Sequence, residues 1–392
     1  MLNADLIFFD AGGGHRSAAE ALRLVMEEQG GWQVRLVNLQ EQLDPIDPLR
    51  WLTGWRMQDA YNLMLKKGWT LGTGQTVRVL QAAIRLLHGK QVRLLGECWH
   101  KNRPDLVASV VPHFNRALAE SLRRSRPATP FVTILTDFAD YPPHFWIEPQ
   151  EQFFICGTER AAAQAREAGI PGDRISQTSG MILHPHFCQH TVCDRRAERE
   201  RRGLDPGLPT GLVLFGGQGS NAMLEIAERL ETAPVDVQLI FICGRNEKLA
   251  KALRRRSRPR SFVEGFTKEV PFYMQLSDFF IGKPGPGCVS EALAMGLPAI
   301  VERNAWTLPQ ERYNADWILE KQVGLVVRGP RDIPAAVKLL LEPGNLARFR
   351  ARTAAIRNRA VYEIPAILRR IVERSSGVRA AELEKSLSEQ PA

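Results

Sequence analysis

The chain has 392 residues, of which 44% are hydrophobic, so it can bury a large core and is long enough to favour two domains over one. Its formal net charge of +9 favours an anionic partner, such as a nucleotide, a nucleic acid or an acidic lipid surface. No run approaches the roughly 18 uninterrupted apolar residues of a membrane span, and no secretory signal opens the sequence, so we expect a cytoplasmic protein that touches membranes only peripherally. Its six cysteines are scattered without a CxxC pair, which argues against a disulfide framework.

Short apolar runs alternate with helical patterns along the chain. In the first half the runs lie at 6–9, 34–39, 131–135 and 153–156, and a helical pattern occupies 17–29. A second series of runs and helical patterns follows, at 212–215, 224–230, 238–243, 279–281, 289–295 and 299–301. This alternation is typical of open parallel sheets with crossover helices, so the sequence predicts two α/β domains in tandem.

Composition indicates where the two domains meet. The charge-rich stretch "DRRAERERRGLDPGLP" at 194–209 is typical of a surface linker followed by a turn. We assign 1–190 to an N-terminal domain, 191–208 to the linker, 209–375 to a C-terminal domain and 376–392 to a flexible tail. The pattern at 350–373 predicts one long amphipathic helix, which closes the fold and is able to pack back on the N-terminal domain.

The stretch "DAGGGHRSAAEA" at 10–21 sets three glycines and a histidine between a predicted strand and a predicted helix. Gly12, Gly13 and Gly14 allow a sharp turn and leave amides open at a helix N-terminus, where a phosphate or polar head group is attracted. His15 is able to remove a proton near pH 7. The alternative interpretation is a tight turn that uses glycine for steric reasons, followed by a capping or exposed histidine.

A second glycine turn opens the C-terminal domain in "VLFGGQGSNAMLEIAERL" at 213–230, where Ser220 or Asn221 is available as the helix N-cap. Two such turns, one per domain, suit a cleft at the carboxyl ends of the strands.

Further along, Gly285-Pro286-Gly287 opens a helix that carries Glu291, so that amides suited to a diphosphate stand beside a carboxylate suited to ribose hydroxyls. Gln310, Glu311 and Asn314 follow on a segment able to reach a sugar. The alternative is that Glu291 is an exposed helix residue and Asn314 a cap.

These motifs together resemble glycosyltransferase family 28, whose members include monogalactosyldiacylglycerol synthases, processive diacylglycerol glucosyltransferases and the peptidoglycan N-acetylglucosaminyltransferase. The resemblance spans nearly the whole chain and rests on "AGGGHRSAAEAL" (11–22), "TDFADYPPHFWIEP" (136–149), "GMILHPHF" (180–187), "VLFGGQGS" (213–220), the stretch 263–300 and "LPQERYNA" (308–315). The first two segments are more similar to the diacylglycerol enzymes. The fold implied is GT-B, with two Rossmann-like domains facing each other across a cleft.

The resemblance also implies residue roles. His15 would be the general base on the acceptor hydroxyl, Gly12 to Gly14 would shape the acceptor pocket, and Asp137 would orient or assist. The donor, a UDP-sugar, would be bound in the C-terminal domain by Gly217, Gln218, Gly219, Ser220, Gly265, Phe266, Pro286, Gly287, Glu291, Gln310, Glu311 and Asn314. Displacement in one step would invert the anomeric carbon.

No cofactor and no metal ion is expected, because amides and helix dipoles can stabilise a departing diphosphate and the DxD spacing of metal-bound nucleotides is missing from the sequence. The segment "HPHFCQHTVC" at 184–193 is rich in metal-ligand types, but its spacing fits no known zinc motif, so we favour a solvated linker. In this segment His184 stands where relatives often have arginine.

The segment 49–74 concentrates Trp51, Trp55, Tyr61 and Trp69 among basic residues. Aromatic and cationic side chains beside an apolar face suit docking on an anionic membrane, as a lipid acceptor would require. The alternative is that the tryptophans pack in the core. A second basic run at 251–261 is interpreted as a solvated loop able to touch anionic lipid. Nucleic acid is not expected as a partner, because no recognition motif accompanies the charge.

The sequence therefore predicts a hexosyltransferase that uses a UDP-sugar and a lipid acceptor. Diacylglycerol is the favoured acceptor, because the motifs are most similar to those of the diacylglycerol enzymes. Two alternatives stay open at this point. One is the same donor chemistry on an isoprenoid-linked or small-molecule acceptor, and the other is a catalytically silent protein that binds nucleotide sugars. The motifs do not distinguish glucose from galactose.

Overall fold

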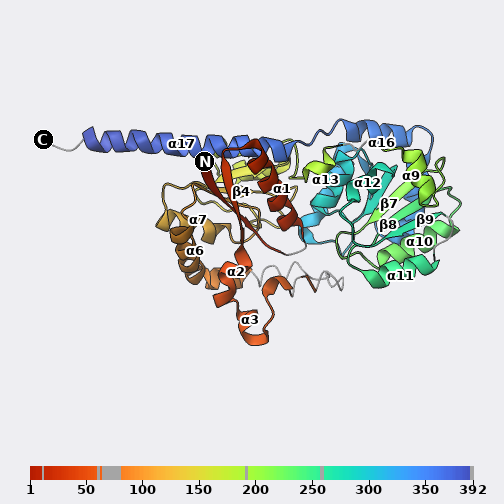
Figure 1. Ribbon diagram of the computed structural model, residues 1–392, viewed down its shortest axis with the longest axis horizontal. Helices are drawn as coiled ribbons and strands as arrows, with labels where there is room; N and C mark the ends of the chain where they lie inside the picture. The colour runs from red at the N-terminus through yellow and green to blue at the C-terminus, as the bar shows by residue number, and fades with distance from the viewer. Residues whose placement is uncertain (11–12, 60–61, 64–80, 190–192, 257–259, 389–392) are drawn as a thin grey trace. The chain divides into compact units, whose positions relative to one another are not determined.

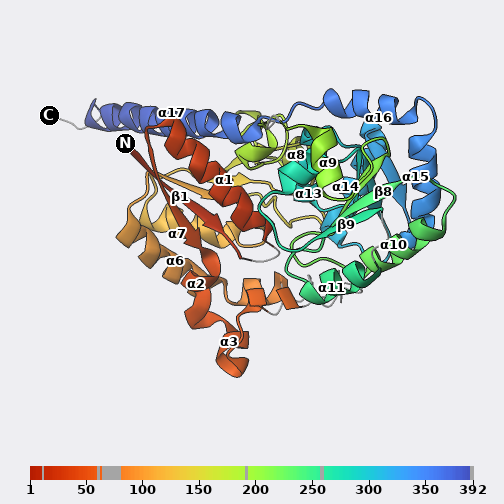
Figure 2. The same cartoon turned by 45° about the vertical axis from the view of Figure 1, so that its right-hand side comes forward.

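The computed structural model describes residues 1–10, 13–59, 62–63, 81–189, 193–256 and 260–388 (Figures 1 and 2). The chain forms two compact units. The first is built from residues 1–61, 74–184 and 359–392, and the second mainly from 185–358. Each unit contains a six-stranded sheet in which every strand pair is parallel, so both units belong to the α/β class that the alternating pattern predicted.

The sheet of the first unit has the strand order β2-β1-β3-β4-β5-β6. Its strands are β1 (Leu2–Phe8), β2 (Trp32–Asn38), β3 (Leu106–Ser109), β4 (Phe131–Ile134), β5 (Phe153–Cys156) and β6 (Ile175–Gln177). Its helices include α1 (Gly14–Gln29), α2 (Leu39–Leu43), α3 (Pro48–Thr53), α6 (His88–Asn102), α7 (Asn115–Ser125), α8 (Glu159–Glu167) and α17 (Ala360–Ser388).

Two hydrophobic clusters cover opposite faces of this sheet. Leu6 and its same-face neighbours pack with α1 and α17, whereas Ile7 packs with α6 and α7. Successive residues of a strand point to opposite faces, which explains why consecutive apolar residues enter different clusters. Figures 1 and 2 show α17 (blue) lying along α1 (red), although more than 300 residues separate them in the sequence.

The sheet of the second unit has the order β12-β11-β10-β7-β8-β9. Its strands are β7 (Thr210–Leu214), β8 (Gln238–Ile242), β9 (Ser261–Glu264), β10 (Phe279–Gly282), β11 (Ala299–Glu302) and β12 (Gly324–Val327). Its helices are α9 (Arg195–Arg201), α10 (Ala222–Thr232), α11 (Glu247–Arg256), α12 (Val270–Gln275), α13 (Pro286–Ala294), α14 (Arg312–Lys321), α15 (Ile333–Leu341) and α16 (Asn345–Ala354), within the described residues.

Each sheet has a topological switch point, where strands are added first on one side of the initial strand and then on the other. In the first unit this switch point lies between β1 and β3, and in the second between β7 and β10. The loops that leave the carboxyl ends of these strand pairs part from each other, and ligands of open α/β sheets bind in the resulting crevice. The topology therefore directs attention to the loops after β1, β3, β7 and β10.

The C-terminal part of the chain differs from the sequence prediction. The single helix predicted over 350–373 is wrong, because α16 ends at Ala354 and α17 begins at Ala360. Between them, the Arg359 amide donates to the Ser179 Oγ at 2.7 Å, which fixes the chain where it passes from the second unit to the first. The helix α17 continues to Ser388, through most of the segment that composition suggested would be a flexible tail.

The segment interpreted as a surface linker contains α9, a helix of the second unit. Asp194 caps its N-terminus, with Oδ1 accepting hydrogen bonds from the amides of Arg196 and Ala197. Arg199, in the middle of the charged run, is only 4% exposed. Charge composition alone indicated solvent exposure, whereas the structure buries this arginine because a carboxylate is available for it.

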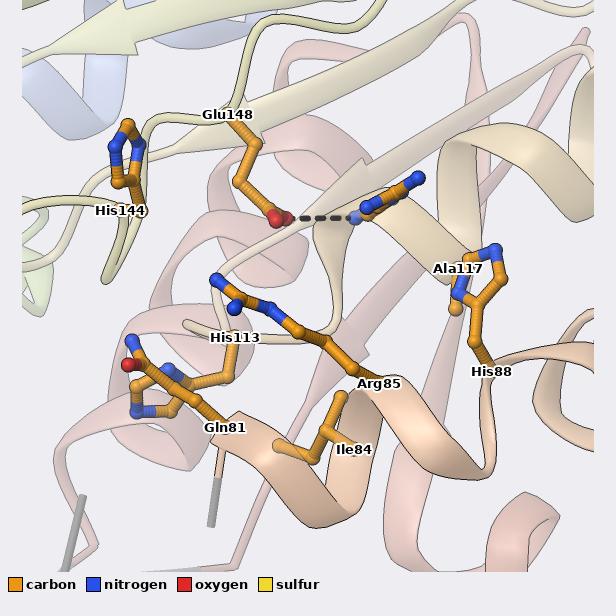
Figure 3. Close-up of a pocket in the computed structure, with 9 residues that line it drawn as sticks. Gln81, Ile84, Arg85, His88, His113, Ala117, His144 and Glu148 are labelled. Carbon is orange, nitrogen blue, oxygen red and sulfur yellow. Dashed lines mark hydrogen bonds between the residues drawn. The ribbon is translucent and has the colours of Figure 1, made fainter. Parts of the chain in front are cut away.

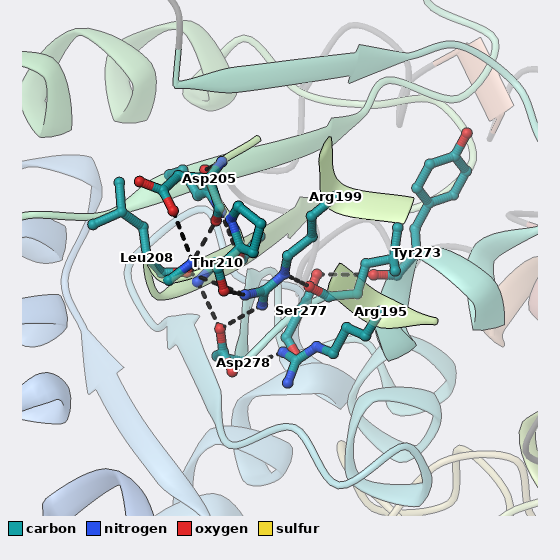
Figure 4. Close-up of polar contacts among 12 residues, drawn as sticks. Arg195, Arg199, Asp205, Leu208, Thr210, Tyr273, Ser277 and Asp278 are labelled. Atoms are coloured by element: carbon teal, nitrogen blue, oxygen red, sulfur yellow. Dashed lines mark hydrogen bonds and ion pairs between the residues drawn. The ribbon is translucent and has the colours of Figure 1, made fainter. Parts of the chain in front are cut away.

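That carboxylate is Asp278, which precedes β10 (Figure 4). It accepts hydrogen bonds from the Thr210 amide at 2.8 Å and from the guanidinium groups of Arg199 at 2.7 Å, Arg195 at 2.7 Å and Arg350 at 2.6 Å. Burial by itself would raise the pKa of Asp278, but Arg195, the Thr210 amide and Arg199 outweigh it and lower that pKa. One carboxylate thus joins α9, the start of β7 and α16.

Replacing this carboxylate, in Asp278→Asn, should lower the free energy of unfolding by about 3–5 kcal/mol, because Arg199 would stay buried without a counter-charge. Urea titration followed by circular dichroism measures the loss. The matched control is Asp236→Asn, which breaks an exposed pair with Arg260 and should cost less than about 1 kcal/mol. Equal losses in the two variants would contradict the role of Asp278.

Candidate active site

His15 is the second residue of α1, on the turn that follows β1 at the switch point of the first unit. Gly13 precedes the helix with φ at 82°, a left-handed conformation that glycine adopts without steric cost. A Cβ on Gly13 or Gly14 would meet no atom within 4 Å, so space is open beside the turn. Gly12 lies outside the described residues.

Two neighbours orient the imidazole of His15. Its Nδ1 lies 3.2 Å from the Oγ1 of Thr136, and the ring also bonds to the backbone of Val110, which follows β3. Burial lowers the pKa of His15 to about 4, and the bond to Val110 offsets this only in part. The imidazole is therefore neutral at pH 7, the form that accepts a proton.

Asp137 is 6% exposed and its Oδ2 accepts a hydrogen bond from the Trp146 Nε1 at 2.8 Å. The centroid of the Trp146 ring lies 6.0 Å from that of His15. Asp137 thus fixes an aromatic wall beside the histidine, while Thr136 contacts the ring itself. The sequence prediction singled out Asp137 and missed Thr136, although the two are adjacent in "TDFADYPP".

A pocket of about 110 Å³ lies on the same unit, and Figure 3 shows the side chains around it. It is lined by Gln81, Ile84, Arg85, His88, His113, Arg116, Ala117, His144 and Glu148. His113 connects it to His15: burial lowers the pKa of His113 to about 4, and repulsion from a protonated His15 would lower it further. This pocket was not predicted, because the sequence analysis missed β3, after which His113 stands.

In the second unit, the turn after β7 is shaped by glycine. Gly216 and Gly219 have positive φ angles of 75° and 62°, and the Gly219 amide donates to the Gly216 carbonyl at 3.1 Å. A Cβ on Gly219 would lie 2.8 Å from the Cys243 carbonyl oxygen, whereas one on Gly217 would meet nothing within 4 Å. The turn is therefore tightly packed on one side and open at Gly217, and Gln218 lies between these two glycines.

The N-terminus of α10 follows this turn directly. Asn221 occupies the N-cap position without a side-chain cap, and the Ser220 Oγ accepts from the Ala222 amide at 3.2 Å. Amides in the first turn of a helix attract anions, so this turn is chemically suited to a phosphate group.

The turn after β8 packs on the same glycines. Its Arg245 amide donates to the Gly217 carbonyl at 2.9 Å, and the Arg245 guanidinium lies 5.0 Å from the ring centroid of Phe266. Phe266 is 58% exposed and follows Gly265, whose amide donates to the Glu264 Oε1 at 2.8 Å. The sequence prediction did not include Arg245, because it lies outside the motifs that carry the resemblance.

The loop after β10 leads into α13, with Gly285 at the N-cap and Pro286 and Gly287 in the first turn. The Glu291 carboxylate points back to this turn, since a Cβ on Gly287 would lie 4.0 Å from its Oε1. Burial raises the pKa of Glu291 to about 7. A hydrogen-bond donor such as a ribose hydroxyl would stabilise the ionised form.

Contacts tie this loop to the segment after β11. The Lys283 Nζ lies 2.7 Å from the Oε1 of Glu311, and the Asn314 Nδ2 donates to the Pro284 carbonyl at 2.7 Å. Asn314 is fully buried, Glu311 is 7% exposed, and Gln310 lies beside Glu311 in the short 3₁₀ helix Pro309–Glu311. Lys283 was missed by the sequence analysis, although it stands inside the quoted "GKPGPG".

The structure brings the predicted donor residues together at the carboxyl edge of one sheet, on the loops after β7, β9, β10 and β11. It places His15 and Asp137 together in the first unit. Among the described residues, no group of three or more His, Cys, Asp or Glu side chains is arranged to hold a metal ion. His190, from the segment rich in metal-ligand types, lies outside them.

An exposed apolar tip lies at α3. Trp51 is 87% exposed, Leu52 74% and Trp55 52%, so these side chains are not core residues and the core alternative is wrong for both tryptophans. Tyr61 and Trp69 lie outside the described residues. In the part of the chain that the structure describes, no helix is both long and apolar enough to cross a membrane.

Comparison with known proteins gives two family matches. Residues 15–181 match the family described as monogalactosyldiacylglycerol (MGDG) synthase, and residues 212–329 match the glycosyltransferase family 28 C-terminal domain. The chain is 28% identical over 357 residues to the chloroplastic monogalactosyldiacylglycerol synthase of Spinacia oleracea, an alignment that covers 86% of this chain and 66% of that protein. The chain thus spans slightly less than two thirds of this relative's length.

Solved structures give the fold. MurG of Acinetobacter baumannii superposes with a TM-score of 0.62 at 12% identity, covering 94% of this chain and 100% of its own. UGT89C1 of Arabidopsis thaliana, complexed with UDP, gives a TM-score of 0.61 at 14% identity, covering 96% and 100%. These are GT-B proteins, which confirms the predicted fold class. The chain therefore combines a segment that matches the monogalactosyldiacylglycerol synthase family with one that matches the glycosyltransferase family 28 C-terminal domain, and it is similar to monogalactosyldiacylglycerol synthases over most of its length.

Proposed function

We propose that this protein is an inverting hexosyltransferase that moves galactose or glucose from a UDP-sugar to the hydroxyl of a lipid, with diacylglycerol as the acceptor. The observation that carries the proposal is the arrangement around the β7–β10 switch point, where two anion-binding turns stand beside the partly buried carboxylate of Glu291. The names of the relatives support it: one is a monogalactosyldiacylglycerol synthase, and one solved GT-B structure contains UDP.

In the proposed donor site, the turn Gly217–Ser220 and the first turn of α13, with Pro286 and Gly287, bind the diphosphate through amides. Glu291 accepts hydrogen bonds from the two ribose hydroxyls. The base lies beside Gly265 and Phe266, whose exposed ring offers a stacking surface. Gln310 and Glu311 contact the hexose, and the buried Asn314 supports the loop through its bond to Pro284.

In the proposed acceptor site, the turn Gly12–Gly14 shapes the pocket and His15 removes the proton from the lipid hydroxyl. Because the imidazole is neutral at pH 7, no prior deprotonation is needed. Asp137 assists by fixing Trp146 beside the histidine. The hydroxyl oxygen then attacks the anomeric carbon from the side opposite UDP, so a single displacement inverts the configuration.

The lipid acceptor implies contact with a membrane, and we place the protein in the cytoplasm, at the cytoplasmic face of an anionic membrane. The apolar tip of Trp51, Leu52 and Trp55 supports this, since tryptophans favour the membrane–water interface. The net charge of +9 favours an anionic surface.

The first test is transfer of radiolabelled hexose from UDP-glucose and UDP-galactose into diacylglycerol in anionic liposomes, with and without EDTA. We expect a labelled glycolipid that survives EDTA. His15→Ala should lower transfer at least about 100-fold, the usual contribution of a general base, while UDP binding stays unchanged.

The matched control for this test is His100→Ala, which alters an exposed histidine of α6 and should keep full activity. Wild-type protein that binds UDP but labels no lipid would point to another acceptor or to a catalytically silent binding protein. Loss of UDP binding in His15→Ala would show that the role of His15 is misassigned.

The raised pKa of Glu291 predicts that donor binding depends on pH. Ribose hydroxyls donate to the ionised carboxylate, so affinity for a UDP-hexose should rise as pH increases through 7 and level off above 8. If binding lowers this pKa well below 6, the gain between pH 6 and 8 is roughly tenfold. Isothermal titration calorimetry measures it.

Glu291→Gln should remove this pH dependence. Glu302 provides the matched control, because burial and the charge of Glu225 also raise its pKa to about 7. Glu302→Gln should leave the pH dependence in place. If the pH dependence of donor binding disappeared in Glu302→Gln and persisted in Glu291→Gln, Glu302 and not Glu291 would be its source.

The apolar tip predicts a membrane-binding defect. Replacing Trp51, Leu52 and Trp55 by serine should weaken binding to vesicles of phosphatidylglycerol and phosphatidylcholine by roughly tenfold or more, because burial of even one large apolar side chain contributes about 1.5–3 kcal/mol. Co-sedimentation measures binding. Leu339→Ser, which changes another exposed leucine, is the control and should bind like wild type. Unchanged binding of the triple variant would exclude the tip as the contact.

A further inference from the structure

Lys283 follows β10 directly and lies between the two turns of the proposed donor site. A Cβ on Gly216, in the turn after β7, would be 3.7 Å from the Lys283 Cε. A Cβ on Gly285, at the start of α13, would be 3.2 Å from that Cε and 3.6 Å from the Nζ. β10 pairs with β7, with Gly282 opposite Leu214, which brings the two turns together. The Lys283 side chain therefore lies against both turns, with its ammonium group beside the start of α13.

A second contact joins the two turns. The Cys288 thiol, in the first turns of α13, bonds to the backbone of Gly216, and burial raises the pKa of this thiol to about 12. The turns are thus in direct contact through this bond. A ligand that bridges their amides would meet the Lys283 side chain.

The ion pair of Lys283 and Glu311 is exposed to solvent mainly on the lysine side. Its Nζ lies 2.7 Å from the Glu311 Oε1, and the Lys283 side chain is 36% exposed whereas that of Glu311 is 9% exposed. The carboxylate is the buried partner of the pair, and the ammonium is the partner that solvent and ligands reach. An ammonium group carries three donors, and this one is accessible to a ligand, so an oxyanion can approach it beside Glu311.

We propose that Lys283 binds the diphosphate of the sugar donor and stabilises the charge that develops on it during transfer. This rests on the proposed function of the same site. In the transfer step, the bond between the anomeric carbon and the β-phosphate oxygen breaks, and its electron pair stays on the departing UDP. The acceptor oxygen forms the new bond to that carbon, and its proton passes to His15.

Lys283 acts at the leaving-group end of this step. The departing UDP gains one negative charge, and a fixed ammonium beside the diphosphate lowers the energy of that charge more than solvent would. The amides of the two turns carry only partial positive charges, whereas the Lys283 ammonium brings a full positive charge to the diphosphate. Glu311 keeps the lysine paired before the donor binds.

The test compares UDP with uridine as ligands, using the full chain and isothermal titration calorimetry. Lys283→Met should weaken UDP binding roughly 10- to 100-fold, the usual effect of losing a charge-assisted hydrogen bond, and should leave uridine binding unchanged. Lys283→Arg should keep most of the UDP affinity. The matched control is Lys338→Met, which removes an exposed lysine of α15 and should bind both ligands like wild type.

A second variant distinguishes loss of diphosphate binding from a folding defect. Lys283→Met leaves Glu311 buried without its partner, and a folding defect would weaken uridine and UDP binding alike. The double variant Lys283→Met/Glu311→Gln removes both charges, and it should bind uridine normally while UDP binding stays weak. Recovery of wild-type UDP affinity in the double variant would overturn the proposal, as would a single variant that binds UDP normally.

The outcome is distinguishable from failure of the proposed function. A wild-type protein that binds UDP but transfers no hexose to lipid would refute the transferase, while the contrast between UDP and uridine would still decide the role of Lys283. A wild-type protein that binds UDP no better than uridine would refute the role of Lys283 directly. If the transferase is active, kcat of Lys283→Met should fall further than its loss of donor affinity explains.

Discussion

Both halves of this protein depend on one constraint, the parallel sheet whose first strand has later strands on either side. Such a sheet cannot send all its connections the same way, so the loops beside the first strand diverge. In the first unit this creates the place for His15 and the Val110 backbone that it contacts. In the second it brings the two glycine turns side by side. The strand order therefore decides which loops carry the reactive groups, and side-chain contacts then fix the orientation of each group.

Desolvation shifts the pKa values of His15 and Glu291 in opposite directions, and both shifts favour the uncharged form. Burial lowers the pKa of the His15 imidazole to about 4 and raises that of the Glu291 carboxyl to about 7, so both are moved toward the uncharged form. For His15 this keeps the lone pair available. For Glu291 it means that the ligand completes the hydrogen bonding of the carboxylate. Lys283 and Glu311, by contrast, both stay charged, because each is the counter-charge of the other.

Local patterns were enough to predict the α/β class and the glycine turns, because strand, turn and helix follow one another within about 20 residues. The resemblance extended this to GT-B. Contacts between distant segments were beyond the reach of local patterns: Arg199 was interpreted as a solvated linker residue because its partner Asp278 lies 79 residues further on. Thr136, His113, Arg245 and Lys283 went unpredicted for the same reason, since each gains its role from a loop elsewhere in its sheet. The strand β3 was also missed, although it is as long as β4 and β5, which the sequence predicted.

The return of the chain to the first unit has a consequence for biosynthesis. Ala360, Ile364 and Leu368 of α17 are buried in the same hydrophobic cluster as Leu22 and Met26 of α1. A ribosome makes α1 early and α17 only after the whole of the second unit, so the apolar face of α1 waits for its cover while some 170 residues are translated between His184 and Arg359. The main part of the second unit, 185–358, is continuous in the sequence and is complete before α17 is made. The N-terminal unit, although it is begun earlier, is therefore the one that is finished last.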